Sequence, residues 1–410
     1  MRKRVVITGI GAVTPIGNNV PEYFEGLRSG SNGITEVTKF DVSDSKCKVC
    51  AEVKNFDSSK LFDKLTRRKT DLYVQYAVCA AQEAVDDSGI LGNIDENELG
   101  VYVGSGVGGI NTLCEEDQKM MSGGARMVSA HFVPKMIINI AAGQIAIRFH
   151  AHGPAMNVST ACATGSTAIG EAFRAIRDGY LTAAICGGTE AAVNPLAIAG
   201  FVNCMALSQA TDPNAASLPF DIRREGFVLG EGAAIMILEE YEHAVKRGAN
   251  IYAEVCGYGA TCDAHHVTAP DPSATQTIRA IAQAMDGVEY DPERTYVNAH
   301  GTGTKLNDKV ETHAFKTYFG ENASKLHISS TKSMTGHMLG AAGSAEAMAC
   351  VLALNEDIVP PTINLIEPDP ELDLDYTPNT AVHTPIDTAV STSLGFGGHN
   401  TCLVLKKVQK

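Results

Sequence analysis

One cysteine of this chain stands where a nucleophile is expected. The stretch STACATG, residues 159–165, places Cys162 between the apolar run AMNVST and the helix-forming run TGSTAIGEAFRAI. A thiol at a strand-to-helix turn meets the partial positive charge of the helix N-terminus, which favours the thiolate. We therefore expect a lowered pKa for Cys162 and a nucleophilic thiol at neutral pH. The small neighbours Ala161, Ala163 and Gly165 would allow a tight turn.

Two histidines strengthen this interpretation. His300 ends the strand-like run TYVNAH, and His337 follows the stretch STKSMTG, which repeats the Ser-Thr-x-x-x-Thr-Gly frame with Lys332 inside it. A lone cysteine or histidine is more often a structural core residue. One thiol and two imidazoles at turn positions form a set that could carry out nucleophilic catalysis.

The surrounding pattern predicts the elements that would position these residues. Short apolar runs at residues 5–10, 100–105 and 183–188 predict buried strands, and residues 73–89 and 165–179 predict helices. Strands that alternate with helices are typical of an α/β fold with parallel or mixed sheets.

Four pairs of short stretches recur in the same order, which indicates an internal duplication. GIGA resembles GYGA, YVGSG resembles YVNAH, STACATG resembles STKSMTG, and CGGTE resembles FGGHN. We expect two related α/β halves, residues 1–250 with Cys162 and residues 251–410 with both histidines. A pseudo-twofold axis would bring the two Ser-Thr-x-x-x-Thr-Gly turns towards each other.

The composition argues against several classes of partner. The 410 residues are 44% apolar and 20% charged, an ordinary balance for a soluble globular protein. A net charge of −14 makes nucleic acid and anionic membranes poor partners for the whole molecule. The first apolar run contains glycines and a proline, so it predicts a strand rather than a signal peptide. We expect a cytoplasmic protein that makes no contact with nucleic acid or membrane.

The cysteines point to neither a disulfide framework nor a metal site. Their number is odd, 11, and their spacing is irregular. Cys47 and Cys50 form one CxxC, but no second pair follows at the spacing of a zinc site. A reduced chain without a bound metal is the simpler interpretation.

Four ordered segments carry a specific resemblance that covers nearly the whole chain. STACATG, NAHGTGT with NDKVE, STKSMTGHMLGAAG and GFGGHN resemble signature segments of the β-ketoacyl-acyl-carrier-protein synthases, condensing enzymes of the thiolase superfamily. The likeness is greatest to the type II elongating enzymes of bacterial fatty acid synthesis. It implies a thiolase-like fold of layers αβαβα with two mixed sheets. It also implies a homodimeric acyltransferase that needs no metal or organic cofactor.

The resemblance assigns roles in a decarboxylative condensation. Cys162 would accept an acyl group from acyl carrier protein, and malonyl-acyl carrier protein would then lose CO2 and attack the thioester. The imidazole N–H groups of His300 and His337 would stabilise the malonyl oxyanion. Lys332 would orient the site electrostatically and pair with Glu311.

Further residues would handle the substrate. The backbone N–H groups of Cys162 and Phe396 would receive the oxyanion of acyl transfer, and the Phe396 ring would gate the acyl pocket. The hydroxyls of two threonines would bind the phosphopantetheine arm that the carrier brings. Three apolar residues would line the acyl pocket, the last of them across the dimer interface, although core packing is the alternative for all three. The residues concerned are Thr302, Thr304, Val107, Phe201 and Phe132.

The densest basic stretch of the chain, KLTRRK, matches the carrier-docking region of the family. Its cations are Lys64, Arg67, Arg68 and Lys69. The alternative is a solvated helix face without a partner. Because acyl carrier protein is strongly acidic, a local basic patch could overcome the net negative charge of the chain.

Four departures from the family pattern leave the substrate open. Leu394, His399, Leu218 and Met205 stand where the family usually has Phe, Thr, Arg and Arg. They put chain-length preference, gating and the choice of carrier in doubt, so a condensing enzyme of a dedicated polyketide or polyene pathway is the alternative. A catalytically silent chain-length factor would lack the nucleophile. A Cys-His hydrolase would need an Asn or Asp to orient its base, and none is obviously placed.

Overall fold

The computed structural model describes residues 2–408, so residue 1 and residues 409–410 of the two predicted halves lie outside it. The strands are β1 (Val5–Val13), β2 (Thr35–Glu36), β3 (Val49–Cys50), β4 (Leu99–Gly104), β5 (Ala155–Met156), β6 (Ala183–Glu190), β7 (Gly232–Glu240), β8 (Ala253–Cys262), β9 (Thr295–Asn298), β10 (His327–Ser329), β11 (Ile358–Val359), β12 (Val382–His383), β13 (Thr388–Gly395) and β14 (His399–Lys406). The helices are α1 (Val20–Ser29), α2 (Lys64–Arg68), α3 (Leu72–Ser88), α4 (Ile110–Gly123), α5 (Phe132–Met136), α6 (Ile140–Phe149), α7 (Thr164–Arg177), α8 (Pro195–Asn203), α9 (Tyr241–Arg247), α10 (Thr275–Ala284), α11 (Lys305–Phe319), α12 (Lys332–Thr335) and α13 (Ala342–Glu356).

The elements expected from the sequence pattern are present. The three predicted strands correspond to β1, β4 and β6, and the two predicted helices correspond to α3 and α7. Helix α3 begins at Leu72 behind Asp71, whose side chain accepts a hydrogen bond from Tyr73 N–H, and ends at Gly89 in the left-handed conformation. The apolar period and the terminal glycine thus predict this helix to within a residue at each end.

The sheet order confirms the internal duplication. From one edge to the other the strands run β10-β9-β13-β14-β8-β1-β7-β6-β4-β5. In the first half, β4 lies parallel to β5 and β6, and β7 is antiparallel to its neighbours. In the second half, β9 likewise lies parallel to β10 and β13, and β14 is antiparallel to its neighbours. Residue 250, near which the boundary is predicted, stands in the connection between α9 and β8.

The expected number of sheets needs a refinement. Each half contributes five strands to a mixed sheet, but residues 5–7 of β1 pair antiparallel with residues 253–255 of β8. This short pairing joins the two five-stranded sheets into one ten-stranded sheet. Each joining strand is the first strand of its own half in sequence order, so the duplication places two equivalent strands side by side at the pseudo-twofold axis.

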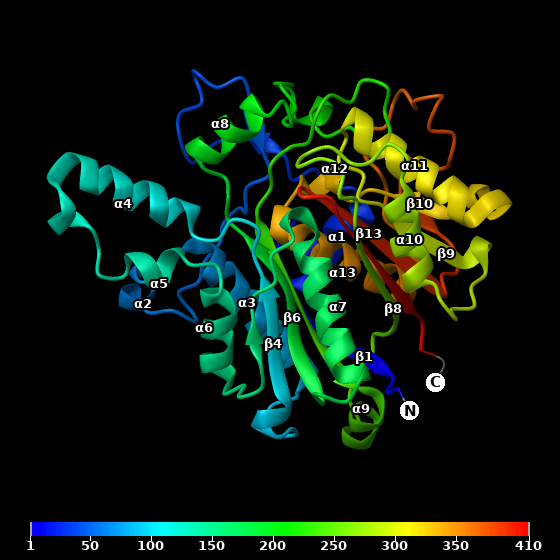
Figure 1. Cartoon of the computed structure of the whole chain (residues 1–410), viewed down its shortest axis with the longest axis horizontal. Coiled ribbons are helices and arrows are strands. Elements are labelled where there is room, and N and C mark those ends of the chain that lie inside the picture. The colour runs from blue at the N-terminus through cyan, green and yellow to red at the C-terminus, as the bar shows by residue number, and fades with distance from the viewer. Residues whose placement is uncertain (1, 409–410) are drawn as a thin grey trace.

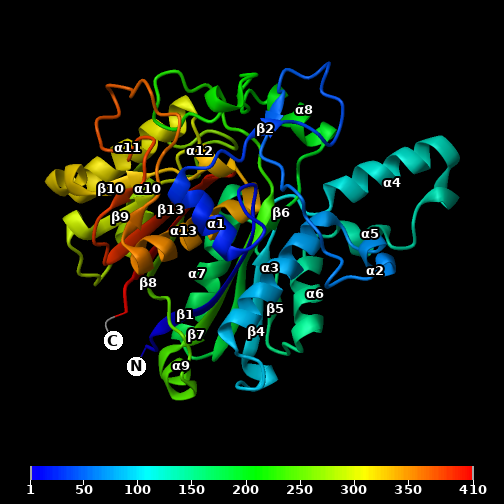
Figure 2. The same ribbon diagram turned by 180° about the vertical axis from the view of Figure 1, so that it is seen from behind.

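The helices form layers on both faces of the two half-sheets (Figures 1 and 2). Helices α7 and α13 pack against each other in the middle and contact strands of both halves. Helices α3 and α6 cover the outer face of the first half, and α10 and α11 cover that of the second. No helix between residues 2 and 408 has both the length and the hydropathy that crossing a bilayer requires.

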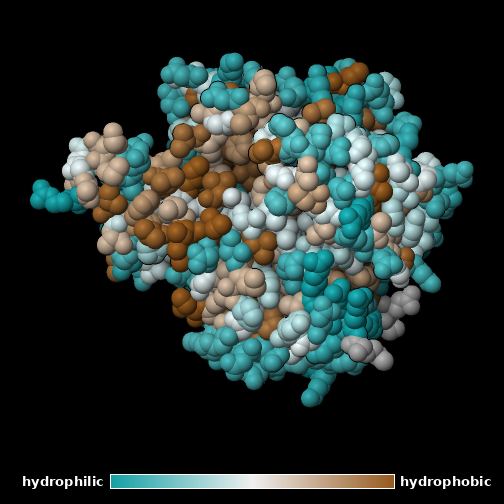
Figure 3. Space-filling view, viewed as in Figure 1, coloured by the Kyte–Doolittle hydropathy of each residue, from teal (hydrophilic) through white to brown (hydrophobic). Residues whose placement is uncertain are grey.

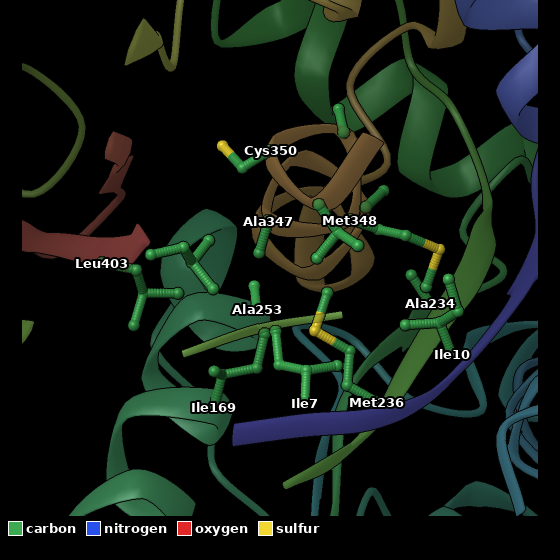
Figure 4. Close-up of a cluster of buried hydrophobic side chains, with 14 of the residues drawn as sticks. Ile7, Ile10, Ile169, Ala234, Met236, Ala253, Ala347, Met348, Cys350 and Leu403 are labelled. Atoms are coloured by element: carbon green, nitrogen blue, oxygen red, sulfur yellow. The ribbon is translucent and has the colours of Figure 1, made fainter. Parts of the chain in front are cut away.

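The central core is shared by the two halves, which therefore form one body. Figure 4 shows Ile7 of β1, Ile169 of α7 and Met236 of β7 beside Met348 of α13 and Leu403 of β14. All five side chains are buried. Burial of a side chain of this size stabilises the fold by about 1.5–3 kcal/mol, so this layer holds the halves in a fixed relation.

The two copies of the Ser-Thr-x-x-x-Thr-Gly frame do not occupy structurally equivalent positions in the two halves. In the first half a single 3-10 turn, Ala161–Ala163, leads directly into α7, with Ala161 at φ 50°. In the second half the matching 3-10 turn into α13 is Leu339–Ala341, with Leu339 at φ 45°. Gly340 is therefore the structural counterpart of Cys162. The prediction based on STKSMTG was wrong because that stretch forms the additional helix α12 ahead of the turn.

Candidate active site

Cys162 lies in the 3-10 turn that opens α7, at the bottom of a cavity of about 580 Å³. The backbone of Ala161 adopts a left-handed conformation that few non-glycine residues take, and this strain directs the next residue into the cavity. The side chain is only 8% exposed. The sharp turn predicted from the small neighbours is confirmed.

The expected drop in the pKa of Cys162 is not found. Burial raises the pKa of the thiol to about 11, and the negative charges of Glu190 and Glu346 add to this effect. The Lys332 ammonium and a hydrogen bond from the Phe396 backbone N–H act in the opposite direction. Desolvation of the thiolate outweighs them in the site without substrate, so the nucleophile rests there as a thiol.

Both histidines are neutral and present the same nitrogen as a donor. Burial, followed by the charge of Lys332, holds the pKa of His300 and of His337 well below its usual range. Nδ1 of His337 accepts a hydrogen bond of 3.3 Å from Leu339 N–H, and Nδ1 of His300 lies 3.1 Å from Nζ of Lys332. Because a backbone N–H and an ammonium can only donate, each ring carries its proton on Nε2.

The two imidazoles are close neighbours in the cavity wall. Their ring centroids lie 5.2 Å apart with the planes nearly perpendicular. The Phe227 ring meets the His337 ring at a centroid distance of 5.0 Å and shields it. His300, His337 and Cys162 all line the same cavity. The structure thus brings together the three residues that the sequence singled out, with two N–H donors available beside one thiol.

The partner expected for Lys332 is wrong. Its ammonium is hydrogen-bonded to the Glu346 carboxylate of α13, not to Glu311. Lys332 and Glu346 are both almost fully buried, so each charge depends on the other for its stability. The physical reason is direction: Lys332 opens α12 and its side chain extends towards α13, where Glu346 is the acid within reach.

Glu311 instead holds the backbone that carries His300. Its carboxylate accepts hydrogen bonds from the backbone N–H groups of His300 and Gly301, at 2.8 and 2.6 Å, and from Thr392 Oγ1 at 2.8 Å. Asn307 Nδ2 adds a fourth at 2.9 Å. Glu311 therefore positions His300 through its main chain rather than through Lys332.

The backbone of Phe396 contacts Cys162, and its ring lines the cavity. The N–H group donates to the Cys162 sulfur, while the ring lies 6.5 Å from the ring of Phe201, measured between centroids. Both rings line the cavity next to Cys162. The residue is thus placed where an N–H donor for acyl transfer and a movable apolar cover would both be needed.

The predicted substrate residues lie in the cavity wall, with one exception. Val107, Phe201, Thr302 and Thr304 line it, and the hydroxyls of the two threonines are 3.0 Å apart. Phe132 begins α5 and is not among the lining residues of its own chain. Its role across a dimer interface stays a prediction.

The basic stretch forms the short helix α2 and its C-terminus. Lys64, Arg68 and Lys69 are exposed, Arg67 is half-buried, and none of the four forms an ion pair within the part of the chain that the structure describes. Their charges are available to a partner. Docking of a carrier on them stays a prediction.

Three of the four family departures belong to the cavity. Leu394 and His399 line it beside Phe396, and Met205 lies at its mouth with 85% of its surface exposed. Leu218 is buried under the turn that holds Gly303 and the two threonines. The substitutions therefore change the entrance and gate and leave the Cys-His-His set unaltered.

Two buried acids of the site were not singled out by the sequence pattern. Glu346 lies in α13, where residues 342–354 are all buried, and Glu190 ends the fully buried strand β6. A lone acid in a run of small and apolar residues is the signal that could have revealed both. A buried charge must have partners, so such a residue marks a polar site in the core.

The fold and the site define a class. A duplicated thiolase-like α/β chain with a buried cysteine, a backbone N–H donor at its sulfur and two neutral imidazole donors is typical of the condensing enzymes, a class of acyltransferases. Residues 2–244 match the family described as beta-ketoacyl synthase, N-terminal domain, and residues 252–366 match beta-ketoacyl synthase, C-terminal domain. The chain belongs to the beta-ketoacyl synthase family.

Relatives of known activity resemble the chain over its full length. A Synechocystis protein named 3-oxoacyl-[acyl-carrier-protein] synthase 2 is 49% identical over 100% of this chain and 99% of its own length. Proteins of the same name from Staphylococcus aureus and Coxiella burnetii are 47% and 45% identical over 99% of both chains.

Solved ketosynthases share the fold. A type II polyketide ketosynthase in complex with its acyl carrier protein superposes with a TM-score of 0.92 at 34% identity, and covers 100% of both chains. The ishigamide ketosynthase/chain length factor gives a TM-score of 0.92 at 35% identity, also over 100% of both chains. The layered fold predicted from the sequence is confirmed.

Proposed function

We propose that this protein is a 3-oxoacyl-[acyl-carrier-protein] synthase that elongates acyl chains by decarboxylative Claisen condensation in fatty acid synthesis. The observation that carries the proposal is the arrangement of Cys162 beside two neutral imidazoles whose Nε2–H groups are fixed as donors by Lys332 and by Leu339 N–H. The relatives of 45–49% identity carry the same name.

The first half-reaction is acyl transfer to Cys162. The sulfur attacks the thioester carbonyl of an acyl group on the carrier, the bond to the phosphopantetheine sulfur breaks, and the thiol proton ends on the released carrier thiol. The negative oxygen formed on the way would meet the Phe396 N–H, which already donates to the Cys162 sulfur, and the Cys162 N–H. The Lys332 ammonium favours the attacking thiolate.

The second half-reaction is condensation. The bond between the malonyl carboxylate and its methylene carbon breaks, CO2 leaves, and the electron pair moves into the malonyl thioester as an enolate. The Nε2–H donors of His300 and His337 stabilise this oxyanion. The methylene carbon then attacks the acyl-cysteine carbonyl, the bond to Cys162 breaks, and the thiolate takes up one proton. We propose that no metal or organic cofactor takes part, because hydrogen-bond donors meet each negative oxygen.

The direct test is a reconstituted condensation assay. The protein, an acyl-acyl carrier protein and malonyl-acyl carrier protein are mixed, and CO2 and 3-oxoacyl-acyl carrier protein are measured by mass spectrometry. Equal amounts of CO2 and of a product two carbons longer support the proposal. Release of free fatty acid instead would point to the hydrolase alternative.

The substrate would span the cavity from its mouth to Cys162. The phosphopantetheine arm, which belongs to the carrier and not to this protein, would pass the hydroxyls of Thr302 and Thr304, and the acyl chain would lie against Val107 and Phe201. The carrier would dock on the exposed cations of α2, since its acidic surface complements them. The solved ketosynthase complex shows that a related protein does bind an acyl carrier protein.

A homodimer is the proposed assembly. Strand β5 lies at one edge of the sheet with both of its residues exposed, and an edge strand is a template for pairing with a second chain. Figure 3 shows an apolar surface over α4, α5 and α6 on the same side, to which several exposed side chains contribute. They are Leu113, Met120, Met121, Val133 and Ile147.

The assembly can be tested with one charged substitution. Met156→Lys places a cation on the β5 edge, so we expect light scattering to give the mass of a single chain for this variant and of two chains for the natural protein. Tyr180→Lys, at a side chain that is 80% exposed in the turn between α7 and β6, is the matched control. A dimer that persists in Met156→Lys would place the interface elsewhere. Phe132 would complete the acyl pocket of the partner chain, and a cytoplasmic location agrees with this function.

Synthesis of a polyketide or polyene is the second candidate. One solved neighbour is a type II polyketide ketosynthase, and Leu394 leaves more space at the gate than the usual phenylalanine. The solved ketosynthases are only 34–35% identical, against 45–49% for the fatty acid enzymes, so fatty acid elongation is favoured. Products from a panel of saturated and unsaturated acyl-carrier substrates distinguish the two.

A further inference from the structure

A buried acid outside the catalytic set ties together two walls of the cavity. Glu190, the last residue of β6, has no exposed surface. Its Oε1 accepts hydrogen bonds from Ser105 Oγ at 2.8 Å and from Val107 N–H at 3.2 Å. Its Oε2 accepts from Gly106 N–H at 2.9 Å and from Gly340 N–H at 3.1 Å. Each oxygen thus has two donors, and all four come from other segments of the chain.

The backbone around this carboxylate is built to fit it. A Cβ atom on Gly106 would lie 2.8 Å from Glu190 Oε2, and one on Gly340 would lie 2.9 Å from the same oxygen. Any larger residue at these positions would push the carboxylate away. All four groups that contact the carboxylate donate hydrogen bonds to it, and the Ser105 hydroxyl oxygen in turn accepts a hydrogen bond from Gly108 N–H. The pocket therefore suits an ionised carboxylate, which can only accept hydrogen bonds.

No basic side chain pairs with this charge among residues 2–408. Burial raises the pKa of Glu190, and its hydrogen bonds oppose that rise. Replacing such a group with an apolar one would remove a costly charge, so stability alone does not account for an acid here. Its position in the cavity wall offers a different reason.

The four donors belong to the segments that enclose the acyl group. Gly106 and Val107 line the cavity next to Cys162. Gly340 follows Leu339, which also lines the cavity and whose N–H fixes the tautomer of His337. One carboxylate therefore sets the distance between the wall of the acyl pocket and the turn that carries the histidine.

We infer that Glu190 is a positioning residue, which holds the Ser105–Val107 loop and the Gly340 turn in register around Cys162 and so sets the acyl-chain preference, while its negative charge restrains the reactivity of the thiol. This inference rests on the proposed function for the acyl-chain preference only. The reactivity of Cys162 can be measured without any substrate, so the two can fail separately.

The electrostatic consequence has a definite sign. The charged groups that act on Cys162 are the Lys332 ammonium, which lowers the pKa of the thiol, and the carboxylates of Glu190 and Glu346, which raise it. His300 and His337 are neutral. Removal of the Glu190 charge leaves Lys332 less opposed, so the thiolate should form at lower pH.

The test compares three variants. Glu190→Gln removes the charge and puts an amide NH2 group against backbone donors. Glu190→Asp keeps the charge but is too short to reach both segments. Ser105→Ala removes one donor and is the mildest change. Glu83→Gln is the matched control, because the Glu83 carboxylate also binds backbone N–H groups, those of Ala12 and Val20, but lies away from the cavity.

Two quantities are measured on each folded variant, with circular dichroism to check folding. The first is the rate of Cys162 alkylation by iodoacetamide against pH, followed by mass spectrometry of the Cys162 peptide. We expect the Glu190→Gln profile to move down by about 0.5–1 pH unit, which is about a three- to tenfold faster reaction at a fixed pH near 8. Glu190→Asp should keep the profile of the natural protein.

The second quantity is acyl transfer from carriers with short, medium and long chains. Both Glu190 variants should lose about 10–100-fold in transfer of long chains relative to the shortest, because displacement of a positioned wall by about 1 Å has effects of this size. Ser105→Ala should change the profile in the same direction and by less. If Glu190→Gln does not fold, the chain-length profile of Ser105→Ala tests the positioning role instead.

Several results would overturn the inference. A folded Glu190→Gln protein with an unchanged alkylation profile and an unchanged chain-length profile would leave Glu190 as core packing only. An equal shift in Glu83→Gln would show a general effect of acids that bind backbone N–H groups. If the natural protein transfers no acyl chain at all, the proposed function fails, but the alkylation shift would still test the effect of the Glu190 charge on Cys162.

Discussion

Nδ1 of His300 lies 3.1 Å from Nζ of Lys332, and this contact decides which proton the imidazole offers to the cavity. An ammonium has no lone pair, so the ring nitrogen must accept, and the ring proton must sit on Nε2. Burial, followed by the charge of the same lysine, lowers the pKa of His300 and keeps the ring neutral. Lys332 thus turns a histidine that could have served as a base into a hydrogen-bond donor.

Loss of the lysine should impair decarboxylation and stability separately. Lys332→Met removes the group that keeps the ring proton of His300 on Nε2. We therefore expect CO2 release from malonyl-acyl carrier protein to fall by about 100-fold, the typical effect of one lost oxyanion donor. It also leaves the Glu346 carboxylate buried without its partner, at a cost of about 3–5 kcal/mol in the free energy of unfolding.

The double variant Lys332→Met/Glu346→Gln separates these effects. It should regain most of the thermal stability, because no unpaired charge remains, but not the decarboxylation activity. Recovery of CO2 release together with stability would mean that Lys332 serves only to hold the fold.

The reactivity of Cys162 towards iodoacetamide should keep rising with pH well above neutrality. The thiolate is the reacting form, and burial raises the pKa of this thiol to about 11. The alkylation rate of the free enzyme should therefore increase about tenfold per pH unit between about pH 7 and pH 10. Peptide mass spectrometry separates Cys162 from the ten other cysteines. A plateau at neutral pH would show that the helix N-terminus and Lys332 outweigh burial.

Charge reversal on α2 should weaken carrier binding without touching the chemistry. Arg68→Glu combined with Lys69→Glu should raise KM for acyl-acyl carrier protein by about tenfold at low salt, and the difference should shrink as salt is added. Small acyl thioesters that lack the carrier should react as before. Lys246→Glu, an exposed cation on α9, is the control. An unchanged KM at low salt would move the docking surface away from α2.

Removal of the Phe396 ring should affect the two half-reactions unequally. Phe396→Ala keeps the backbone N–H that donates to Cys162 but loses the ring beside Phe201. We expect acyl transfer to Cys162 to fall by at least about tenfold, since the ring encloses the acyl chain, while malonyl decarboxylation changes little. Equal losses in both half-reactions would mean that the ring only packs its loop.

The fold could be predicted from the sequence because its signals are local and repeated. The period of α3 with Gly89 behind it, and the buried runs of β1, β4 and β6, each predict an element where one is found. The β1–β8 pairing that joins the half-sheets depends on how the halves meet, which no single segment encodes. The likeness of STACATG and STKSMTG misled for a related reason: short matches do not reveal that α12 is an insertion.

The site was predictable in its residue types and less so in its pairings. Cys162, His300 and His337 stand at turns with distinctive neighbours, and the structure places all three in one cavity. The choice between Glu311 and Glu346 as the partner of Lys332 depends on the direction of a side chain across a helix interface. The pKa of Cys162 likewise depends on how deeply the packed chain buries it, which the turn motif does not contain.

The central claim is that Cys162 transfers the acyl group while the two histidines stabilise the malonyl oxyanion. Cys162→Gln removes the nucleophile and puts a neutral amide in its place, so condensation should stop while decarboxylation of malonyl-acyl carrier protein persists or rises. Adding His300→Ala or His337→Ala to this variant should lower decarboxylation by about 100–1000-fold, since each removes one donor worth about 2.7–4 kcal/mol. Phe201→Ala, which changes the same cavity without removing a donor, is the control.

The deciding measurement is the rate of CO2 release from malonyl-acyl carrier protein by Cys162→Gln, with and without each histidine. The account predicts rapid release by Cys162→Gln and the stated loss when either imidazole is removed. Normal release by the histidine variants would contradict it, and one of the histidines would then have to act as the base that deprotonates Cys162.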